Sequence, residues 1–284
     1  MASKFTISED LASLIHSSAK ILAAAGKVAA FTGAGMSAES GIGTFRGQGG
    51  LWKGIVGPVA LTVFGTPVGW RLMPVVSWKA YLSHFYDPMK PALPNPGHRA
   101  LATLAEAGVP VKIVTQNVDG LHQRAGSDPS GVYEVHGTVL KYKCNHNGHR
   151  YEFPVDQAAD PQVMPDLPRS PPVCSVPGCG YYIRPDCVLF TENLPGGTWA
   201  RAEDAMTELG PGDVLLVVGT SSTVQPAASL PVAAAAKGAH VFEFNLEETS
   251  FGSLPNHTFF QGPAGQILPA LVEEALRIRG EGRS

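Results

Sequence analysis

The sequence has little of what marks secreted, membrane-spanning or nucleic-acid-binding proteins. Its 284 residues contain only 4 cysteines, which indicates reduced thiols or a metal site rather than a disulfide framework. Charged residues make up 16% of the chain, and the net charge of -3 offers no basic excess for constitutive nucleic-acid binding. The N-terminal region lacks an unbroken apolar stretch of the roughly 20 residues that a membrane span requires. We therefore expect neither a nucleic acid nor a membrane as a direct partner.

We expect no targeting signal at the N-terminus. Residues 1–10 contain neither the charged start nor the apolar run of a secretory signal, and the stretch before the first predicted helix is short for a transit peptide. We expect an intracellular, cytoplasmic location, with mitochondrial or nuclear placement as alternatives. The length suffices for one large domain, alone or with a smaller satellite.

An amphipathic helix is predicted over residues 8–25. Ser8 is a suitable N-cap, Glu9 and Asp10 suit the positive end of the helix, and Gly26 can end it. The apolar residues recur at helical spacing on one face: Leu11, Leu14, Ile15, Ile21 and Leu22.

Four short apolar runs predict buried parallel strands, because they alternate too little for a sheet with one wet face. These runs are Val28–Thr32, Val111–Thr115, Val214–Val218 and Val241–Phe244. Helical patterns over 98–107, 226–237 and 266–279 alternate with the later runs, which indicates a doubly wound α/β sheet. The predicted fold is a Rossmann-like domain (1–46, 96–139, 187–284) with a smaller helical domain inserted (47–95, 140–186), which contains Cys144, Cys174 and Cys179 and would be of the zinc-ribbon type if these cysteines bind a metal.

Polar or glycine-rich segments follow each predicted strand. They are Gly33-Ala34-Gly35, then Gln116-Asn117-Val-Asp119, then Gly219-Thr220-Ser221-Ser222, then Asn245. Because the carboxyl ends of parallel strands share one edge of a sheet, we expect all four segments to meet in one ligand-binding crevice. The glycines would let backbone amides approach a pyrophosphate.

Each of these signals has an ordinary structural alternative. A glycine turn often follows a strand for geometric reasons, and no acidic residue ends a second strand at the expected spacing, so Asn245 is the candidate for the ribose hydroxyls. Asn117 and Asp119 also suit turns. His136, before a glycine, is either structural or catalytic, and Arg46 is either a surface ion-pair partner or a phosphate clamp.

Taken together, the segments resemble the sirtuin family, in the family's order and over nearly the whole chain. The matching motifs are Gly33-Ala-Gly-x-Ser37-x-x-Ser40-Gly41-Ile42 with Phe45-Arg46, Thr115-Gln-Asn-Val-Asp-Gly-Leu-His122, His136-Gly137, Gly219-Thr-Ser-Ser222 and Phe244-Asn245. Within the family the sequence is most similar to the class III sirtuins.

The resemblance implies an NAD-dependent protein-lysine deacylase. The acyl oxygen attacks the ribose carbon that bears nicotinamide, His136 acts as general base on a ribose hydroxyl, and the products are free lysine, nicotinamide and O-acyl-ADP-ribose. Asn117 and Asp119 complete the implied catalytic set. The implied NAD-binding residues are Gly33, Ala34, Gly35, Ser37, Glu39, Ile42, Phe45, Arg46, Gln116, Asn117, Asp119, Gly219, Thr220, Ser221 and Asn245. A neutral imidazole suits proton removal near neutral pH.

Acyl-lysine proteins are the implied substrates. By resemblance, Val188-Leu189-Phe190 with Glu192 pairs its backbone with the substrate peptide, although an ordinary strand is the alternative. Cys187 is expected to be a packing residue.

The acyl pocket departs from the class III pattern. Gly65 before Thr66-Pro67 supplies the expected small residue and Tyr86 the tyrosine, but Met89 stands where an arginine would hold an acidic acyl group. A thioether cannot replace a guanidinium that binds a carboxylate. We therefore expect a wide, apolar pocket that favours neutral acyl chains over succinyl, unless Lys90 or Arg71 supplies the cation.

The family's zinc site is also incomplete. Cys144, Cys174 and Cys179 are present, but Asn147 takes the place of the fourth cysteine. A closed zinc site needs four N or S ligands, so either His149 or His146 completes a Cys3His set or zinc has been lost.

Two other functions use the same residues. The first is mono-ADP-ribosyl transfer or NAD hydrolysis at the same site. The intact His136 favours deacylation over these reactions. The second is a non-catalytic, NAD-responsive binding module, against which the retained Asn117, Asp119 and His136 predict turnover.

Overall fold

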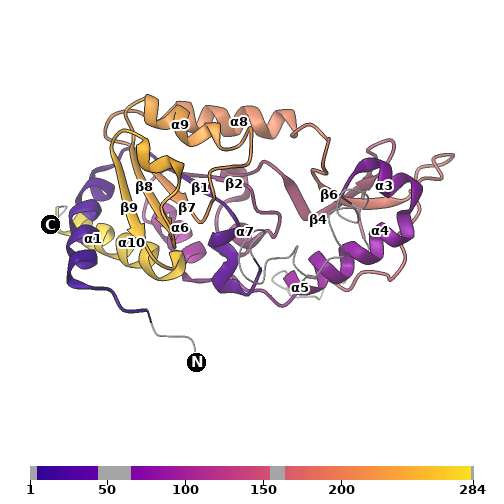
Figure 1. The fold of residues 1–284 in the computed structure, drawn as a ribbon, viewed down its shortest axis with the longest axis horizontal. Helices are drawn as coiled ribbons and strands as arrows, with labels where there is room; N and C mark the ends of the chain where they lie inside the picture. The colour runs from indigo at the N-terminus through magenta and orange to yellow at the C-terminus, as the bar shows by residue number, and fades with distance from the viewer. Residues whose placement is uncertain (1–4, 44–64, 154–163, 283–284) are drawn as a thin grey trace.

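The computed structural model describes residues 5–43, 65–153 and 164–282. A parallel sheet of six strands forms one half of the molecule, in the order β3-β2-β1-β7-β8-β9 (Figure 1). The strands are β1 (Val28–Thr32), β2 (Val111–Thr115), β3 (Val132–Glu134), β7 (Val214–Val218), β8 (His240–Asn245) and β9 (His257–Gln261). None of the helices in the described ranges is both long and apolar enough to span a bilayer.

Helices cover both faces of this sheet, so the predicted doubly wound α/β fold is confirmed (Figure 1). On β1, Val28 and Ala30 face one helical layer, whereas Ala29 and Phe31 face the other. The first layer contains α1 (Glu9–Ala24), α6 (Pro96–Glu106) and α10 (Ala264–Glu281); the second contains α8 (Gly196–Thr207) and α9 (Ser229–Ala236). Burial on both faces explains why these strands are continuous apolar runs.

The predicted elements of this domain are confirmed, with small shifts at their ends. Helix α1 begins after Ser8, whose side chain accepts a hydrogen bond from the Leu11 N–H (3.2 Å), and it ends before Gly26. The four predicted strands are present, the last of them longer by one residue at each end. The pattern did not predict β3, β9 or α8. Strands β3 and β9 are the two edges of the sheet. β3 has only three residues and β9 is only partly buried, so their apolar signal is weak.

The smaller module lies to one side of the sheet (Figure 1). It contains an antiparallel sheet in the order β5-β4-β6, with β4 (Gly137–Cys144), β5 (Arg150–Tyr151) and β6 (Ile183–Cys187). Its helices are α3 (Pro67–Leu72), α4 (Pro74–Tyr81) and α5 (Asp87–Met89), with a π-helical turn (Leu82–Tyr86) between the last two. Short connecting elements complete the fold: α7 (Leu121–Arg124) and the 3₁₀ turns at Ala34–Ser40, Pro129–Gly131 and Ser250–Ser253.

Aromatic side chains fill the core of this module. Trp78 is fully buried and packs against Trp70, Tyr81 and Tyr142, with ring centroids 5.6–6.4 Å apart. This cluster is separate from the two cores that flank the parallel sheet. The exact domain boundaries proposed from the sequence stay a prediction.

Candidate active site and metal centre

The strand order changes direction between β1 and β7, since β2 and β3 follow on one side and β8 and β9 on the other, and the loops after β1 and β7 contact each other there. The Gly33 N–H donates to the Val218 carbonyl (2.9 Å) and the Gly35 N–H to the Gly219 carbonyl (2.8 Å). Gly219 has φ +60°, and a Cβ on it would lie 2.3 Å from the Met36 nitrogen. Only glycine allows this approach. The strand order thus forms the switch point where open α/β sheets bind ligands.

A cavity of about 1540 Å³ opens at this edge and extends to the smaller module. Most of the residues predicted to bind cofactor or substrate line it: Gly33, Ala34, Gly35, Glu39, Gly65, Gln116, Asn117, His136, Val188, Leu189, Phe190, Glu192, Gly219, Thr220, Ser221 and Asn245. The prediction that the four strand-end segments meet in one crevice is therefore confirmed. Phe45 and Arg46 lie outside the described residues.

Asn117 and Asp119 are held in a hydrogen-bond network through Ser37. The Asn117 side-chain amide donates to the Gly33 carbonyl (2.9 Å) and the Ser37 hydroxyl (3.1 Å), and that hydroxyl donates to Asp119 Oδ2 (2.7 Å). Both amide hydrogens of Asn117 are used in this way, so the group it can offer a ligand is the acceptor Oδ1. Ser37 and Asp119 are buried and do not line the cavity themselves. Burial raises the pKa of Asp119 above that of an ordinary carboxyl, against the hydrogen bonds from Leu121 and Ser37.

His136 is placed as a base at the wall of the cavity. Its Nδ1 lies 3.1 Å from the Gln116 carbonyl oxygen, which can only accept, so Nδ1 carries the proton and Nε2 keeps its lone pair. Burial lowers the pKa of His136 below its ordinary value, and the bond to Gln116 opposes this only in part. The imidazole is therefore neutral at neutral pH and can accept a proton.

The adjoining strand ends are joined by side chains. Gln116 Nε2 donates to the Thr220 hydroxyl, and Asn245 Nδ2 to the Thr220 carbonyl, each at 2.9 Å. The Glu39 carboxylate accepts the Gly265 N–H at the start of α10. Ile42 is 6% exposed and packs in the core of the smaller module, away from the cavity wall.

A buried chain of hydroxyl groups supports Asn117 from behind, and sequence reasoning assigned its members no role. The Thr32 hydroxyl donates to Thr115 Oγ1 (2.8 Å) and lies 3.0 Å from His122 Nε2, and Thr115 Oγ1 accepts the Asn117 N–H (3.0 Å). His122 is buried, which lowers its pKa to about 4. The available signal was the position of His122 in the same motif as Asn117.

The segment after β6 crosses the cavity beside His136. The Val188 N–H donates to the His136 carbonyl (2.9 Å), and the Phe190 N–H donates to the Gly65 carbonyl (2.8 Å). Cys187 also lines the cavity, and burial raises the pKa of its thiol to about 12. It is a neutral packing group, and it lies outside the metal cluster described below.

Tyr86 and Met89 lie away from the cavity, unlike the sequence-based assignment. Tyr86 is 1% exposed and donates to the Pro165 carbonyl (2.6 Å), while Met89 is 4% exposed; both pack in the core of the module. The helix presents Tyr81, His84 and Phe85 to the cavity instead. The π-helical turn Leu82–Tyr86 accommodates an extra residue and changes the helical register at this point, as such turns often do at functional sites.

Tyr81 and His84 have the same three-residue spacing that pointed to Tyr86 and Met89. The two residues considered as substitutes for the missing arginine, Lys90 and Arg71, do not line the cavity. Lys90 forms an ion pair with Asp166 instead. No lysine or arginine lines the cavity within residues 5–43, 65–153 and 164–282.

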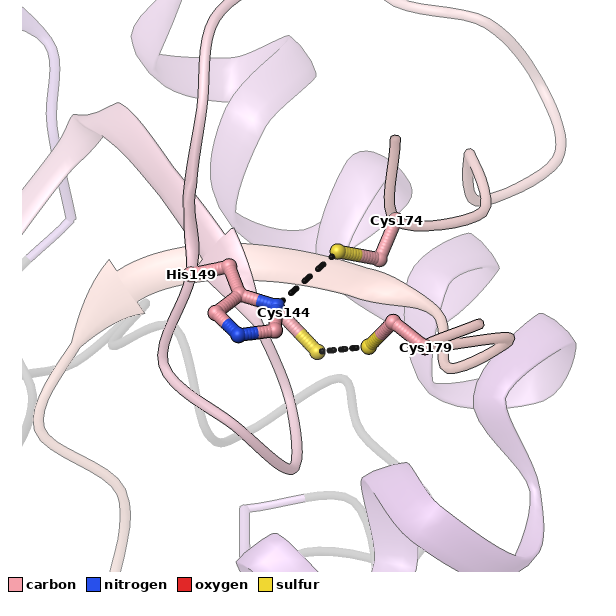
Figure 2. Close-up of side chains that lie close together, drawn as sticks. All are labelled: Cys144, His149, Cys174 and Cys179. Atoms are coloured by element: carbon pink, nitrogen blue, oxygen red, sulfur yellow. Dashed lines mark hydrogen bonds between the residues drawn. The ribbon is translucent and has the colours of Figure 1, made fainter. Parts of the chain in front are cut away.

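The predicted metal ligands form one cluster (Figure 2). One donor atom from each of Cys144, His149, Cys174 and Cys179 lies within 4.8 Å of the others. Cys144 Sγ and Cys179 Sγ are 3.5 Å apart, and His149 Nδ1 is 3.4 Å from Cys174 Sγ. Four ligands around one zinc ion would lie roughly 3.5–3.8 Å from one another. The donor set therefore fits a closed, tetrahedral Cys3His site.

The structure distinguishes the two candidate histidines. The His146 ring stacks on Tyr181 with centroids 4.2 Å apart and is not part of the cluster. Asn147 donates its side-chain N–H to Cys179 Sγ (3.3 Å). A backbone hydrogen bond from Tyr181 and further contacts lower the pKa of Cys179 to about 6, which favours the thiolate that a metal requires.

The fold and the site define an α/β enzyme that binds a nucleotide at the switch point of a parallel sheet. The chain belongs to the Sir2 family, whose model matches residues 33–226, and the resemblance to sirtuins is thereby confirmed. It is 41% identical over 261 residues to "NAD-dependent protein deacylase 2" of Pyrobaculum aerophilum, with 91% of this chain and 95% of that protein covered.

Two solved structures are similar along nearly their whole length. A Sir2 homologue in complex with NAD is 34% identical, with a TM-score of 0.77 and coverage of 93% of this chain and 94% of that one. Sir2Af2 bound to a myristoylated histone peptide is 30% identical, with a TM-score of 0.65 and coverage of 94% and 98%.

Proposed function

We propose that this chain is an NAD-dependent protein-lysine deacylase that releases nicotinamide and forms O-acyl-ADP-ribose. The observation that carries the proposal is the state of His136. Its Nδ1–H donates to the Gln116 carbonyl. The ring lies on the wall of a cavity that runs from the glycine loops after β1 and β7 to the Val188–Phe190 segment. A neutral, oriented base thus lies between a dinucleotide site and a candidate peptide site.

In this proposal the residues at the strand ends bind NAD. The Gly33–Gly35 loop holds the pyrophosphate, and Asn245 contacts a ribose. Asn117 Oδ1 accepts a hydrogen bond from the nicotinamide ribose or carboxamide, and Asp119 keeps Ser37 and thus Asn117 in place. His136 takes a proton from a ribose hydroxyl through Nε2. A relative named for this activity is 41% identical to the chain, which supports the proposed reaction.

The reaction is tested with NAD and a panel of acylated lysine peptides. Peptide-dependent release of nicotinamide together with O-acyl-ADP-ribose is the expected result. Free ADP-ribose without acyl transfer would instead indicate NAD hydrolysis, and ADP-ribose on protein would indicate ADP-ribosyl transfer. NAD binding without turnover would indicate a binding module.

We further propose that the acyl pocket prefers neutral chains, from acetyl to longer groups, over succinyl. The pocket wall from the smaller module consists of aromatic and small side chains: Trp70, Ser77, Ala80, Tyr81 and Phe85. His84 lines the same wall, and an imidazole is a weaker partner for a carboxylate than a guanidinium, which can form two charge-assisted hydrogen bonds. The binding of a myristoylated peptide by Sir2Af2 is in keeping with an apolar pocket.

We also propose that Cys144, His149, Cys174 and Cys179 bind a structural zinc ion. All four positions are occupied by protein ligands, so the site would be closed and would stabilise the smaller module rather than take part in catalysis.

A further inference from the structure

The segment Val188–Glu192 has an unusual conformation for its sequence. Thr191 has φ +75°, in the left-handed region, which a β-branched residue rarely adopts. Thr191 lines the cavity between Phe190 and Glu192. A strained residue in an exposed segment persists only where its surroundings hold it, so the contacts of this segment show what its shape depends on.

A partly buried ion pair between Arg184 and Glu192 connects this segment to Cys187 and strand β6. Arg184, on strand β6, is 2% exposed, and its guanidinium donates to the Cys187 carbonyl (2.9 Å) and to Glu192 Oε1. The second oxygen of Glu192 accepts the Leu189 N–H (2.9 Å). This one ion pair therefore holds Cys187, Leu189 and Glu192 close together.

The same contacts use the backbone donors of the segment. The N–H groups of Val188, Leu189 and Phe190 donate to the His136 carbonyl, the Glu192 carboxylate and the Gly65 carbonyl. All three donors are used within the protein, so a peptide strand laid along the segment meets carbonyl acceptors and must supply the N–H donors itself. Loss of the Glu192 carboxylate would free the Leu189 N–H and remove a restraint on the neighbouring Thr191.

We propose that Arg184, acting through Glu192, is a positioning residue that holds Val188–Phe190 in the conformation that accepts an acyl-lysine peptide. This inference rests on the proposed function, because it assigns the peptide to that segment. Arg184 itself does not line the cavity and is not a catalytic residue. Arginine is suited to the task because one planar guanidinium reaches a carbonyl and a carboxylate together, whereas an ammonium group on a lysine does so less well.

The test compares Arg184→Lys and Glu192→Gln with the wild-type chain. Steady-state kinetics with an acetylated peptide and NAD give KM for each substrate, and circular dichroism monitors folding. For Arg184→Lys we expect KM for the peptide to rise about tenfold, with kcat and KM for NAD within twofold. Glu192→Gln keeps one acceptor oxygen and should raise the peptide KM about threefold. The double variant should show less than the product of the two effects, because both changes release the same segment.

Lys143→Gln is the matched control. It removes a neighbouring ion pair on the same pair of strands, Lys143–Asp186 (2.7 Å), whose side chains form no ion pair with positions 188–192 in the described part of the chain, and it should leave both KM values within twofold. A peptide KM within twofold of wild type in folded Arg184→Lys would overturn the inference, as would an equal rise in KM for NAD. If that variant does not fold, an unchanged peptide KM in Glu192→Gln overturns it. Absence of peptide-dependent turnover in the wild-type chain would instead refute the proposed function.

Discussion

The parallel-sheet domain and the smaller module are built on different kinds of core. In the sheet domain, strands such as β1 and β7 are buried on both faces by helices, and every residue of β1 is at most 1% exposed. In the smaller module, tryptophan and tyrosine rings pack between short elements beside a cluster of three thiols and an imidazole. The difference separates two tasks: the first core aligns the strand ends that form the nucleotide site, and the second shapes the wall of the acyl pocket.

This comparison predicts that substitutions in the sheet domain abolish the reaction, whereas substitutions in the smaller module change the selectivity for the acyl group. His136→Ala should have the largest effect. It removes the base but leaves the glycine loops intact, so deacylation should fall by roughly 10²–10⁴ while the affinity for NAD, measured by calorimetry, stays within a few-fold. Near-normal turnover in this variant would refute the assignment of His136 as the general base.

The metal centre should affect the stability of the smaller module rather than the reaction. His149→Asn removes one of the four proposed ligands and should reduce the zinc retained after a chelator wash by more than tenfold, with the melting temperature lower by roughly 5 °C. His146→Asn is the matched control, since that ring stacks on Tyr181 outside the cluster. Elemental analysis and thermal melting make the comparison. Equal zinc content in the two variants would exclude His149 as a ligand.

The π-helical turn makes a sharper prediction about the acyl pocket. His84→Arg should raise kcat/KM for a succinyl peptide relative to an acetyl peptide about tenfold, because a guanidinium can form two charge-assisted bonds to the distal carboxylate. Ser83→Arg is the control, because Ser83 is exposed, bonds to the Lys79 carbonyl and does not line the cavity. The acyl-peptide panel measures both. If kcat/KM for the succinyl peptide rises in Ser83→Arg but not in His84→Arg, His84 does not face the acyl group.

The smallest effect is expected from a moderate change of pH. Because burial lowers the pKa of His136, the base stays unprotonated at pH 7 and is lost only as the pH falls through a value below about 6.5. Activity should change little between pH 8 and 7 and then drop along an acid limb. The pH dependence of kcat/KM measures this limb. A midpoint above 7 would contradict the position of His136.

Sequence patterns predicted the sheet domain well for a physical reason. Strands buried on both faces are apolar along their whole length, so Val28–Thr32 and Val214–Val218 were located to the residue. Val111–Thr115 was located as well, because Ile113 and Val114 are buried although Lys112 is exposed. The polar residues after them then share one edge by the geometry of parallel strands. The edge strands were missed because β3 is only three residues long and β9 is only partly buried.

The smaller module was predicted less well because its contacts are non-local. The π-helical turn changes the helical register, and spacing rules based on a regular α-helix do not predict this change. Tyr81 and His84 line the cavity, although Tyr81 also packs in the core, whereas Tyr86 and Met89 pack in the core without lining the cavity. Both pairs have the same spacing in the sequence. Only packing against β4 and the residues near Pro165 distinguishes them.

The sequence by itself determined the doubly wound sheet, the strand-end residues of the nucleotide site and the candidate base, because apolar burial and glycine turns are local signals. Tertiary structure decided which histidine completes the metal cluster, which nitrogen of His136 carries the proton and which side chains face the acyl group. These depend on distances between residues far apart in the chain: His149 to Cys174, Gln116 to His136, and Arg184 to the segment it holds.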